Sequence, residues 1–216
     1  MEIKVLKDIL SANEEIAQSN MKLLDSKGVF AVNLMSSPGA GKTSLVLETI
    51  KVLKGKSRIG VIEGDLSSSV DAETISKENI PVVQINTGGG CHLDANMISK
   101  ALSNLPLEGI ELLLIENVGN LVCPAGFALG EHKKVLISSI PEGDDKPLKY
   151  PLMFHEVDAV LINKIDLLPY LKFNIQGFSQ AIRGINEKVE IFQISCSTSQ
   201  GIQEWVSWLL TQMSRR

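Results

Sequence analysis

The sequence has few cysteines, no long apolar run and no excess of basic charge. Three cysteines among 216 residues are too few, and odd in number, for the disulfide framework of a small secreted domain. No stretch approaches the roughly 18 apolar residues of a membrane-spanning helix, and the start Met1-Glu-Ile-Lys lacks a signal-peptide core. We therefore expect a cytoplasmic protein whose cysteines are free to bind metal.

The composition is that of a globular domain, with 44% hydrophobic residues, 21% charged residues and a formal net charge of −4. A mildly acidic chain has no general electrostatic attraction for nucleic acid, and none is expected as a partner. There is no internal repeat or low-complexity linker. We therefore assign residues 1–216 to a single domain with an N-terminal helix over about residues 1–27, capped at Ser11 or Asn13.

Apolar runs and helical periodicities alternate along the rest of the chain. Strands are predicted at 29–34, 58–62, 81–85, 110–115, 134–140, 159–162 and 189–194. Helices are predicted at 43–53, 70–77, 93–102, 173–186 and 201–213, and residues 141–151 are predicted to be a charged loop. The alternation predicts an α/β fold with a doubly wound, mostly parallel sheet flanked by helices. Nearly all polar, glycine-rich clusters follow strands, where ligands bind in such sheets.

A glycine-rich loop between the first predicted strand and the next helix indicates phosphate binding. The string Ser36-Ser-Pro-Gly-Ala-Gly-Lys-Thr43 matches G-x-x-x-x-G-K-[ST], except that Ser36 replaces the first glycine. We expect Lys42 to reach the β- and γ-phosphates and Thr43 to bind Mg²⁺. The alternative is an ordinary glycine-rich turn. The predicted phosphate-binding residues are Pro38, Gly39, Ala40, Gly41, Lys42, Thr43 and Ser44.

The string Asn163-Lys164-Ile165-Asp166 follows a predicted strand and indicates guanine recognition. The Asp166 carboxylate can accept hydrogen bonds from N1–H and the exocyclic amine of guanine, a donor pair that adenine lacks. The aliphatic stem of Lys164 can lie along the base, with Asn163 beside it. The segment Ser195, Cys196 and Ser197, at the end of the last predicted strand, would back the base. A solvated loop is the alternative for both segments.

Two acidic residues, Asp65 and Glu116, end predicted strands near the phosphate-binding loop. One could hold Mg²⁺ while the other positions the attacking water, so we predict that they are catalytic together with Lys42. Helix capping is the alternative for each. Gly119 could let the backbone approach the γ-phosphate and donate its N–H. Intrinsic hydrolysis is expected to be slow, because no Arg or Gln occurs in the segments predicted to face the γ-phosphate.

A candidate metal site consists of Cys91, His92 and Cys123. Two thiolates and an imidazole suit Zn²⁺ or Ni²⁺, although buried structural side chains are an equal alternative from spacing alone. Three ligands leave a tetrahedral site incomplete, so water or a second chain across a two-fold axis would supply the rest. Because Cys123 lies a few residues beyond Gly119, the state of the nucleotide could move a metal ligand.

With these motifs the sequence resembles the HypB family of hydrogenase nickel-incorporation GTPases. The matching segments are 33–43, 62–65, 87–94, 115–124, 142–151 and 163–170. The resemblance implies a P-loop GTPase of the signal-recognition-particle/MinD class that couples GTP binding and hydrolysis to nickel delivery during [NiFe]-hydrogenase maturation. It also implies a GTP-dependent homodimer with Ni²⁺ or Zn²⁺ at the interface, held by Cys91, His92 and Cys123. The implied partners are the nickel chaperone HypA and the hydrogenase large-subunit precursor.

The sequence departs from some members of the family and leaves other functions open. Residues 1–27 contain neither Cys nor His, so the N-terminal metal store of some relatives is not expected. A urease-type nickel GTPase is one alternative, although its Cys-Pro-His motif differs from the adjacent Cys91 and His92. A nucleotide-binding scaffold with negligible turnover, held as a dimer by zinc, is another. Dimer contacts could involve Leu167 and Leu171, and Lys146 or Lys149 could reach across a dimer toward nucleotide; core packing and a solvated loop are the alternatives.

Overall fold

The computed structural model describes residues 4–66 and 69–215, so the first three residues of the predicted N-terminal helix lie outside the described part. Within it, seven strands form one parallel sheet in the order β3-β2-β4-β1-β5-β6-β7. The strands are β1 (Phe30–Ser36), β2 (Ile59–Asp65), β3 (Val82–Asn86), β4 (Leu112–Glu116), β5 (Lys133–Ser139), β6 (Ala159–Asn163) and β7 (Glu190–Gln193). All seven predicted strands are confirmed, with boundaries shifted by a few residues.

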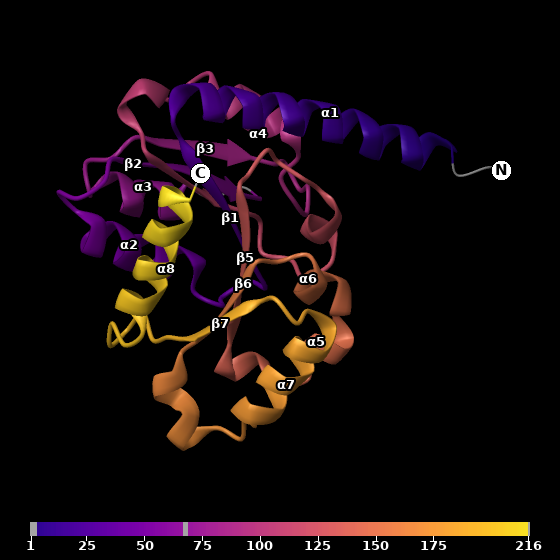
Figure 1. Ribbon diagram of the computed structural model, residues 1–216, viewed down its shortest axis with the longest axis vertical. Helices are drawn as coiled ribbons and strands as arrows, with labels where there is room; N and C mark the ends of the chain where they lie inside the picture. Colours follow the sequence, from indigo (N-terminus) through magenta and orange to yellow (C-terminus); the bar gives the residue numbers. More distant parts are fainter. Residues whose placement is uncertain (1–3, 67–68, 216) are drawn as a thin grey trace.

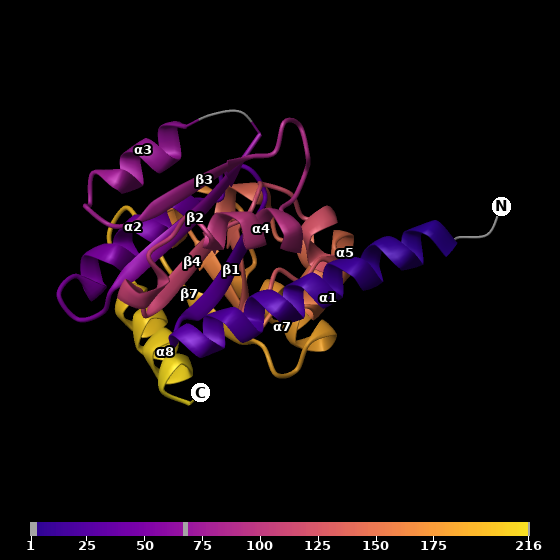
Figure 2. The same ribbon diagram turned by 90° about the horizontal axis from the view of Figure 1, so that it is seen from above.

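Helices cover both faces of the sheet, which confirms the doubly wound architecture. One face carries α2 (Lys42–Leu53), α3 (Val70–Ser76) and α8 (Ile202–Ser214), as Figures 1 and 2 show. The other face carries α1 (Lys4–Lys27), α4 (Ala95–Leu102), α5 (Lys146–Lys149), α6 (Pro151–His155) and α7 (Ile175–Ile185), as Figures 1 and 2 together show. Short 3₁₀ helices are η1 (Leu107–Gly109), η2 (Cys123–Gly126), η3 (Ile140–Glu142) and η4 (Ile165–Tyr170). No helix in the described ranges is both long and apolar enough to cross a bilayer.

The side chains of β1 alternate between two buried cores, as expected for a strand covered on both faces. Phe30, Val32 and Leu34 belong to the core under α2 and α8, whereas Ala31 packs on the side of α1 and α4. In the first core Trp205 is fully buried, and its Nε1 donates to Thr49 Oγ1 of α2 at 3.0 Å. These contacts fix the helix that follows the glycine-rich loop.

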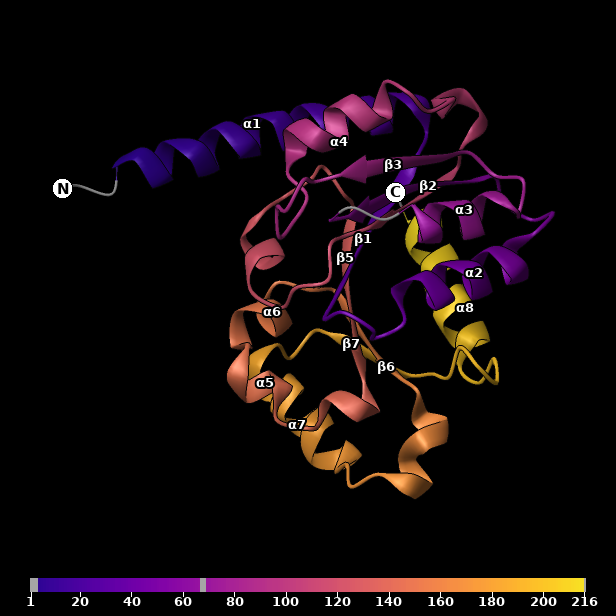
Figure 3. The same cartoon turned by 180° about the vertical axis from the view of Figure 1, so that it is seen from behind.

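Helix α1 runs unbroken past Ser11 and Asn13, so the prediction that either residue caps it is wrong. Asn13 lies in the interior of α1, and its side chain is buried against neighbouring segments. Its Nδ2 donates to the Ala128 carbonyl at 2.8 Å, and its Oδ1 accepts from the Ala95 amide at 2.9 Å. These tertiary hydrogen bonds satisfy the side chain that would otherwise favour a cap. Helix α1 lies along α4, and its first turns extend beyond the rest of the fold (Figure 3).

The charged segment 141–151 is not a plain loop, because it contains α5 and the start of α6. Pro147 and Pro151 stand in the first turns of these helices, where a missing N–H removes no intrahelical hydrogen bond. Phe154 is fully buried with its ring 6.0 Å from that of Phe178 on α7. Tertiary packing therefore overrides the loop-like composition of this segment.

Candidate functional site

The glycine-rich loop joins the central strand β1 to α2, whose first residues are Lys42, Thr43 and Ser44. Gly41 has φ 103°, and a Cβ at this position would collide with Nδ2 of Asn163. That same Nδ2 donates to the carbonyl of Ala40 at 2.9 Å. Only glycine suits both the left-handed backbone and the close approach of Asn163. The loop that follows β6 is therefore anchored directly on the glycine-rich loop.

Ser36 supplies a partner for the loop lysine. Nζ of Lys42 donates to Ser36 Oγ at 3.0 Å, and Ser36 Oγ donates to the Ser37 carbonyl at 2.6 Å. Burial lowers the pKa of Lys42, while the nearby Glu116 carboxyl acts in the opposite direction. The serine that replaces the first glycine of the motif thus holds the ammonium group beside the loop.

Three carboxyl groups gather next to the start of α2. Thr43 Oγ1 donates to Glu116 Oε1 at 2.9 Å. Oxygen atoms of Glu116, Glu63 and Asp71 all lie within 4.8 Å of one another. Asp65 lies outside this set, and its side chain accepts a hydrogen bond from the amide of Leu66.

Glu63 and Asp71 were not among the candidates found in the sequence. The register of the sheet explains the position of Glu63, because it pairs with Glu116 across the β2–β4 ladder. Paired residues on adjacent parallel strands point to the same face of the sheet. Glu63 is the second residue before Asp65 in β2, so an alternation argument could have placed it on the same face as Asp65.

Because Glu63 and Glu116 are buried, ionising their carboxyl groups is costly unless a cation balances the charge. Burial, reinforced by Glu116, raises the pKa of Glu63 to about 8. Burial also raises the pKa of Glu116 to about 7, although Lys42 opposes the shift. Oε2 of each glutamate is buried and has no hydrogen-bond partner among the described residues. Mg²⁺ binds carboxylate and hydroxyl oxygens, so this donor set with Thr43 Oγ1 fits that ion.

The segment after β4 lies against the glycine-rich loop. A Cβ at Gly119 would lie 2.9 Å from the nitrogen and 3.0 Å from Cα of Pro38. The amide of Asn120 donates to the carbonyl of Ser36 at 2.8 Å. Gly119 therefore lies directly against the glycine-rich loop, and its role in nucleotide binding stays a prediction.

We expect Gly119→Ala to lower the affinity for guanine nucleotide about tenfold. The added methyl group would displace the Pro38 backbone or residues 116–120, and overpacking of this kind costs about 1–3 kcal/mol. Titration with a fluorescent GTP analogue measures the effect. Gly126→Ala is the matched control, because a Cβ there has no atom within 4 Å. Equal affinity of Gly119→Ala and the control would contradict the role of this close approach.

The residues predicted to recognise a base lie together beside the glycine-rich loop. Ser195 Oγ donates to Asp166 Oδ1 at 2.6 Å and lies 2.9 Å from Ser197 Oγ. The hydrogen bond from Ser195 is the main cause that lowers the pKa of Asp166, so the carboxylate stays ionised. Lys164 Nζ donates to the Gly39 carbonyl at 2.7 Å, which lays its stem across the loop.

Cys196 contributes its backbone to this region. Its amide donates to Asn163 Oδ1 at 3.3 Å, which joins the segment after β7 to the segment after β6. Burial raises the pKa of the Cys196 thiol to about 11. The thiol therefore stays protonated, and the residue packs against the core formed by β1, α2 and α8.

The three predicted metal ligands converge. Donor atoms of Cys91, His92 and Cys123 lie within 4.8 Å of one another, and Cys91 Sγ is 3.4 Å from His92 Nδ1. The His92 ring packs on Phe127 with the ring centroids 4.1 Å apart. Burial lowers the pKa of His92 and keeps the imidazole in the neutral form that binds metals. Two sulfur atoms and one imidazole nitrogen are a donor set for Zn²⁺ or Ni²⁺.

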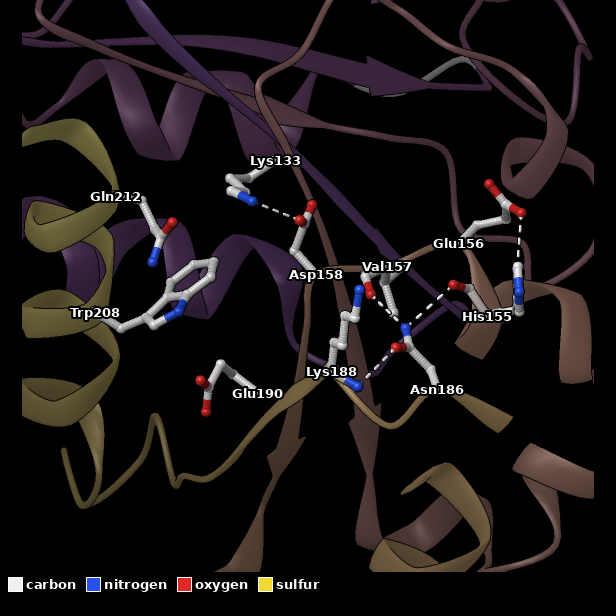
Figure 4. A pocket seen from close by; sticks show the side chains of 10 residues that line it. All are labelled: Lys133, His155, Glu156, Val157, Asp158, Asn186, Lys188, Glu190, Trp208 and Gln212. Carbon is white, nitrogen blue, oxygen red and sulfur yellow. Dashed lines mark hydrogen bonds and ion pairs between the residues drawn. The ribbon is translucent and has the colours of Figure 1, made fainter. Parts of the chain in front are cut away.

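A surface pocket of about 490 Å³ lies at the N-terminal ends of β5, β6 and β7, opposite to the ends that carry the glycine-rich loop and the base-recognition residues (Figure 4). Several of its polar groups pair with one another: Lys133 Nζ bonds Asp158 at 2.6 Å, and His155 lies 3.0 Å from Glu156. Asn186 Nδ2 donates to backbone carbonyls of residues 154, 155 and 157. None of the predicted site residues lines this pocket.

Comparisons with known proteins agree with the fold and the motifs. The family model described as CobW/HypB/UreG, nucleotide-binding domain, matches residues 30–193. The chain is 47% identical over 215 residues to the hydrogenase maturation factor HypB of Azotobacter vinelandii, covering 99% of this chain and 71% of that protein. It is 49% identical over 216 residues to HypB of Rhizobium leguminosarum bv. viciae, covering 99% and 72%. The crystal structure of HypB from Helicobacter pylori in complex with nickel matches with a TM-score of 0.90 and 36% identity, covering 94% of this chain and 96% of that chain.

Proposed function

Because this chain belongs to the HypB family of hydrogenase maturation factors, we propose that it is a GTPase whose nucleotide state controls nickel delivery to a [NiFe]-hydrogenase precursor. The observation that carries this proposal is the segment 116–123. It begins with Glu116, which accepts a hydrogen bond from Thr43 next to the glycine-rich loop. It ends with Cys123, one of the three predicted metal ligands Cys91, His92 and Cys123, which we call the metal cluster. One short stretch of backbone therefore touches both sites.

The nucleotide site has the groups that phosphoryl transfer to water requires. Lys42 would neutralise the β- and γ-phosphates, and Thr43 with Glu116 would hold Mg²⁺. Asp65 would position water from the edge of the carboxyl group set, with Glu63 and Asp71 as further carboxylates near the ion. Positioning and charge stabilisation supply most of the catalysis in such reactions. Hydrolysis would be slow without a partner, because residues 36–44, 63–71 and 116–120 contain no Arg or Gln.

Asp166 would select guanine, with Ser195 and Ser197 orienting its carboxylate. The hydrogen bond from Ser195 leaves the second carboxylate oxygen and the other lone pair of Oδ1 for the base. Lys164 and Asn163 would hold the base-recognition loop against the glycine-rich loop, as their bonds to Gly39 and Ala40 do in this structure. GTP, rather than ATP, is the nucleotide that this arrangement favours.

The metal cluster would be completed by a second copy of the chain. Cys91, His92 and Cys123 offer three donors, and a two-fold axis beside them would bring together the ligands of two chains. Nickel is supported by the nickel complex of the similar Helicobacter pylori protein, and Zn²⁺ suits the same donors. HypA and the hydrogenase large-subunit precursor are the proposed protein partners. The cytoplasmic location stays a prediction.

We expect Cys123→Ala to lower the affinity for Ni²⁺ at least about 100-fold. Loss of groups that only orient metal ligands costs about 10- to 100-fold, and loss of a ligand removes more. Calorimetric titration of the reduced protein with Ni²⁺ and with Zn²⁺ measures affinity and stoichiometry. Cys196→Ala is the control, because this thiol lies apart from the metal cluster. Unchanged metal stoichiometry in Cys123→Ala would overturn the proposed metal site.

A further inference from the structure

Adjacent residues at the end of β4 point to opposite faces of the sheet. Glu116, the last residue of the strand, faces α2 and bonds Thr43. Asn117 is fully buried, and its backbone N–H donates to the Leu34 carbonyl of β1 at 3.0 Å. Since successive side chains of an extended strand alternate, Asn117 reaches the side on which α4 packs. A displacement of Glu116 would therefore move a side chain on the other side of the sheet.

Asn117 holds the backbone next to the first two metal ligands. Its Oδ1 accepts from the amide of Leu93 at 3.0 Å and from the amide of Val118 at 2.9 Å. Leu93 directly follows His92 in the chain. Asn117 thus joins the segment after β4 to the loop that carries Cys91 and His92.

Asn120 holds the backbone at the third ligand. The backbone N–H of Asn120 donates to the carbonyl of Ser36 at 2.8 Å, so the residue is fixed to the glycine-rich loop. Its Oδ1 accepts from the amides of Val122 at 2.7 Å and Cys123 at 3.3 Å. The orientation of Cys123 therefore depends on where Asn120 lies.

Buried polar contacts keep the Asn117 side chain in place. Its Nδ2 donates to Asn33 Oδ1 at 3.2 Å, and Asn33 Nδ2 donates to Glu131 Oε1 at 3.3 Å. Glu131 Oε2 in turn accepts from the amide of Leu129 at 2.7 Å. A hydrogen-bonded network in a low-dielectric interior is rigid and favours discrete arrangements. Because the Asn117 side chain is held in place, a movement of residues 116–120 would also displace the segment that carries Cys91 and His92.

We propose that Asn117 and Asn120 are positioning residues that transmit the nucleotide state from residues 116–120 to the metal ligands. Asn117 acts on the segment that carries Cys91 and His92, and Asn120 acts on Cys123. The inference rests on the proposed function and adds the side chains that carry the coupling. Mg²⁺ and a γ-phosphate would attract Glu116 and the Gly119 amide. Because the backbone of Leu93 and Cys123 is bonded to asparagines of the same segment, the metal ligands would shift with it.

The test compares Ni²⁺ affinity of the full chain in two nucleotide states, with Mg²⁺ and a non-hydrolysable GTP analogue or with Mg²⁺ and GDP. In the unmodified protein we expect the two dissociation constants to differ by about fivefold or more. Asn120→Ala, which removes the acceptor oxygen, should reduce this ratio by about threefold or more. Asn120→Asp keeps an acceptor oxygen and should preserve the ratio. Asn120 is only partly buried, so both variants are expected to fold.

The outcomes separate the inference from the function on which it rests. An unmodified protein with equal Ni²⁺ affinity in both states would remove the proposed function. A coupled unmodified protein together with a fully coupled Asn120→Ala would overturn only the inference. The inference would also fall if Asn120→Ala weakened Ni²⁺ binding equally in both states, because that result indicates a purely structural role. Loss of coupling in both Asn120 variants would overturn it too, since the acceptor oxygen would then not carry the effect.

Discussion

Lys42→Ala is expected to lower the rate of GTP hydrolysis about 100- to 1,000-fold. Lys42 is the first residue of α2. Its ammonium group lies close enough to the Glu116 carboxyl group for each to shift the pKa of the other. Removing one preorganised group that stabilises developing charge typically costs a factor of this size. The variant also removes the ammonium group that opposes the raised pKa of Glu63 and Glu116, and the loss of this positive charge should weaken binding of the nucleotide phosphates.

Single-turnover phosphate release measures this effect, with Lys51→Ala as the matched control. Lys51 lies on the same helix, but its side chain is exposed and pairs with Glu48 at 3.3 Å. The control should hydrolyse GTP at the unmodified rate. Equal phosphate release from the unmodified protein and Lys42→Ala would rule out catalysis by this site and leave a nucleotide-binding scaffold.

Asp166→Asn is expected to lower GTP affinity at least about 100-fold and to raise affinity for xanthosine triphosphate. Two hydrogen bonds from guanine to an ionised carboxylate are worth about 1.5–3 kcal/mol each. An amide presents one donor and one acceptor, which mismatches the amine of guanine and matches the 2-oxo group of xanthine. The hydrogen bond from Ser195 would orient the new side chain, since its carbonyl oxygen can still accept.

Competition between GTP and xanthosine triphosphate for a fluorescent nucleotide measures this change. Glu190→Gln serves as the control, because Glu190 is an exposed carboxylate at the start of β7, the end of the strand opposite to Ser195. The control should keep the preference for GTP. If Asp166→Asn also kept it, the base would have to bind elsewhere.

The alternation of strands and helices was predictable because each strand is a run of apolar residues between turn-forming segments. Packing decided what local composition could not. Pro147 and Pro151 favoured a loop in the sequence, yet they stand in the first turns of two helices. Pro147 of α5 is itself buried, and Met153 and Phe154 pack α6 into the core. Asn13 resembled a cap until the structure placed backbone groups of Ala95 and Ala128 against it.

The motif residues of the site were predictable from spacing, whereas groups brought in by register were not. Lys42, Thr43 and Asp166 stand in short strings whose chemistry is local. Glu63 joins Glu116 only because β2 pairs with β4 in one register. Asn117 and Asn120 gave no signal in the sequence, because the partners of an asparagine amide depend on which backbone groups the fold brings to it.

Coupling between the nucleotide site and the metal cluster is tested most directly by the affinity of the unmodified protein for Ni²⁺ in its two nucleotide states. Calorimetry with Mg²⁺ and either GDP or a non-hydrolysable GTP analogue would give both dissociation constants under matched conditions. If the segment 116–123 couples the two sites, the constants differ by about fivefold or more, and nickel changes the nucleotide affinities by the same factor. Identical Ni²⁺ affinities in the two states would contradict a nucleotide-controlled metal site.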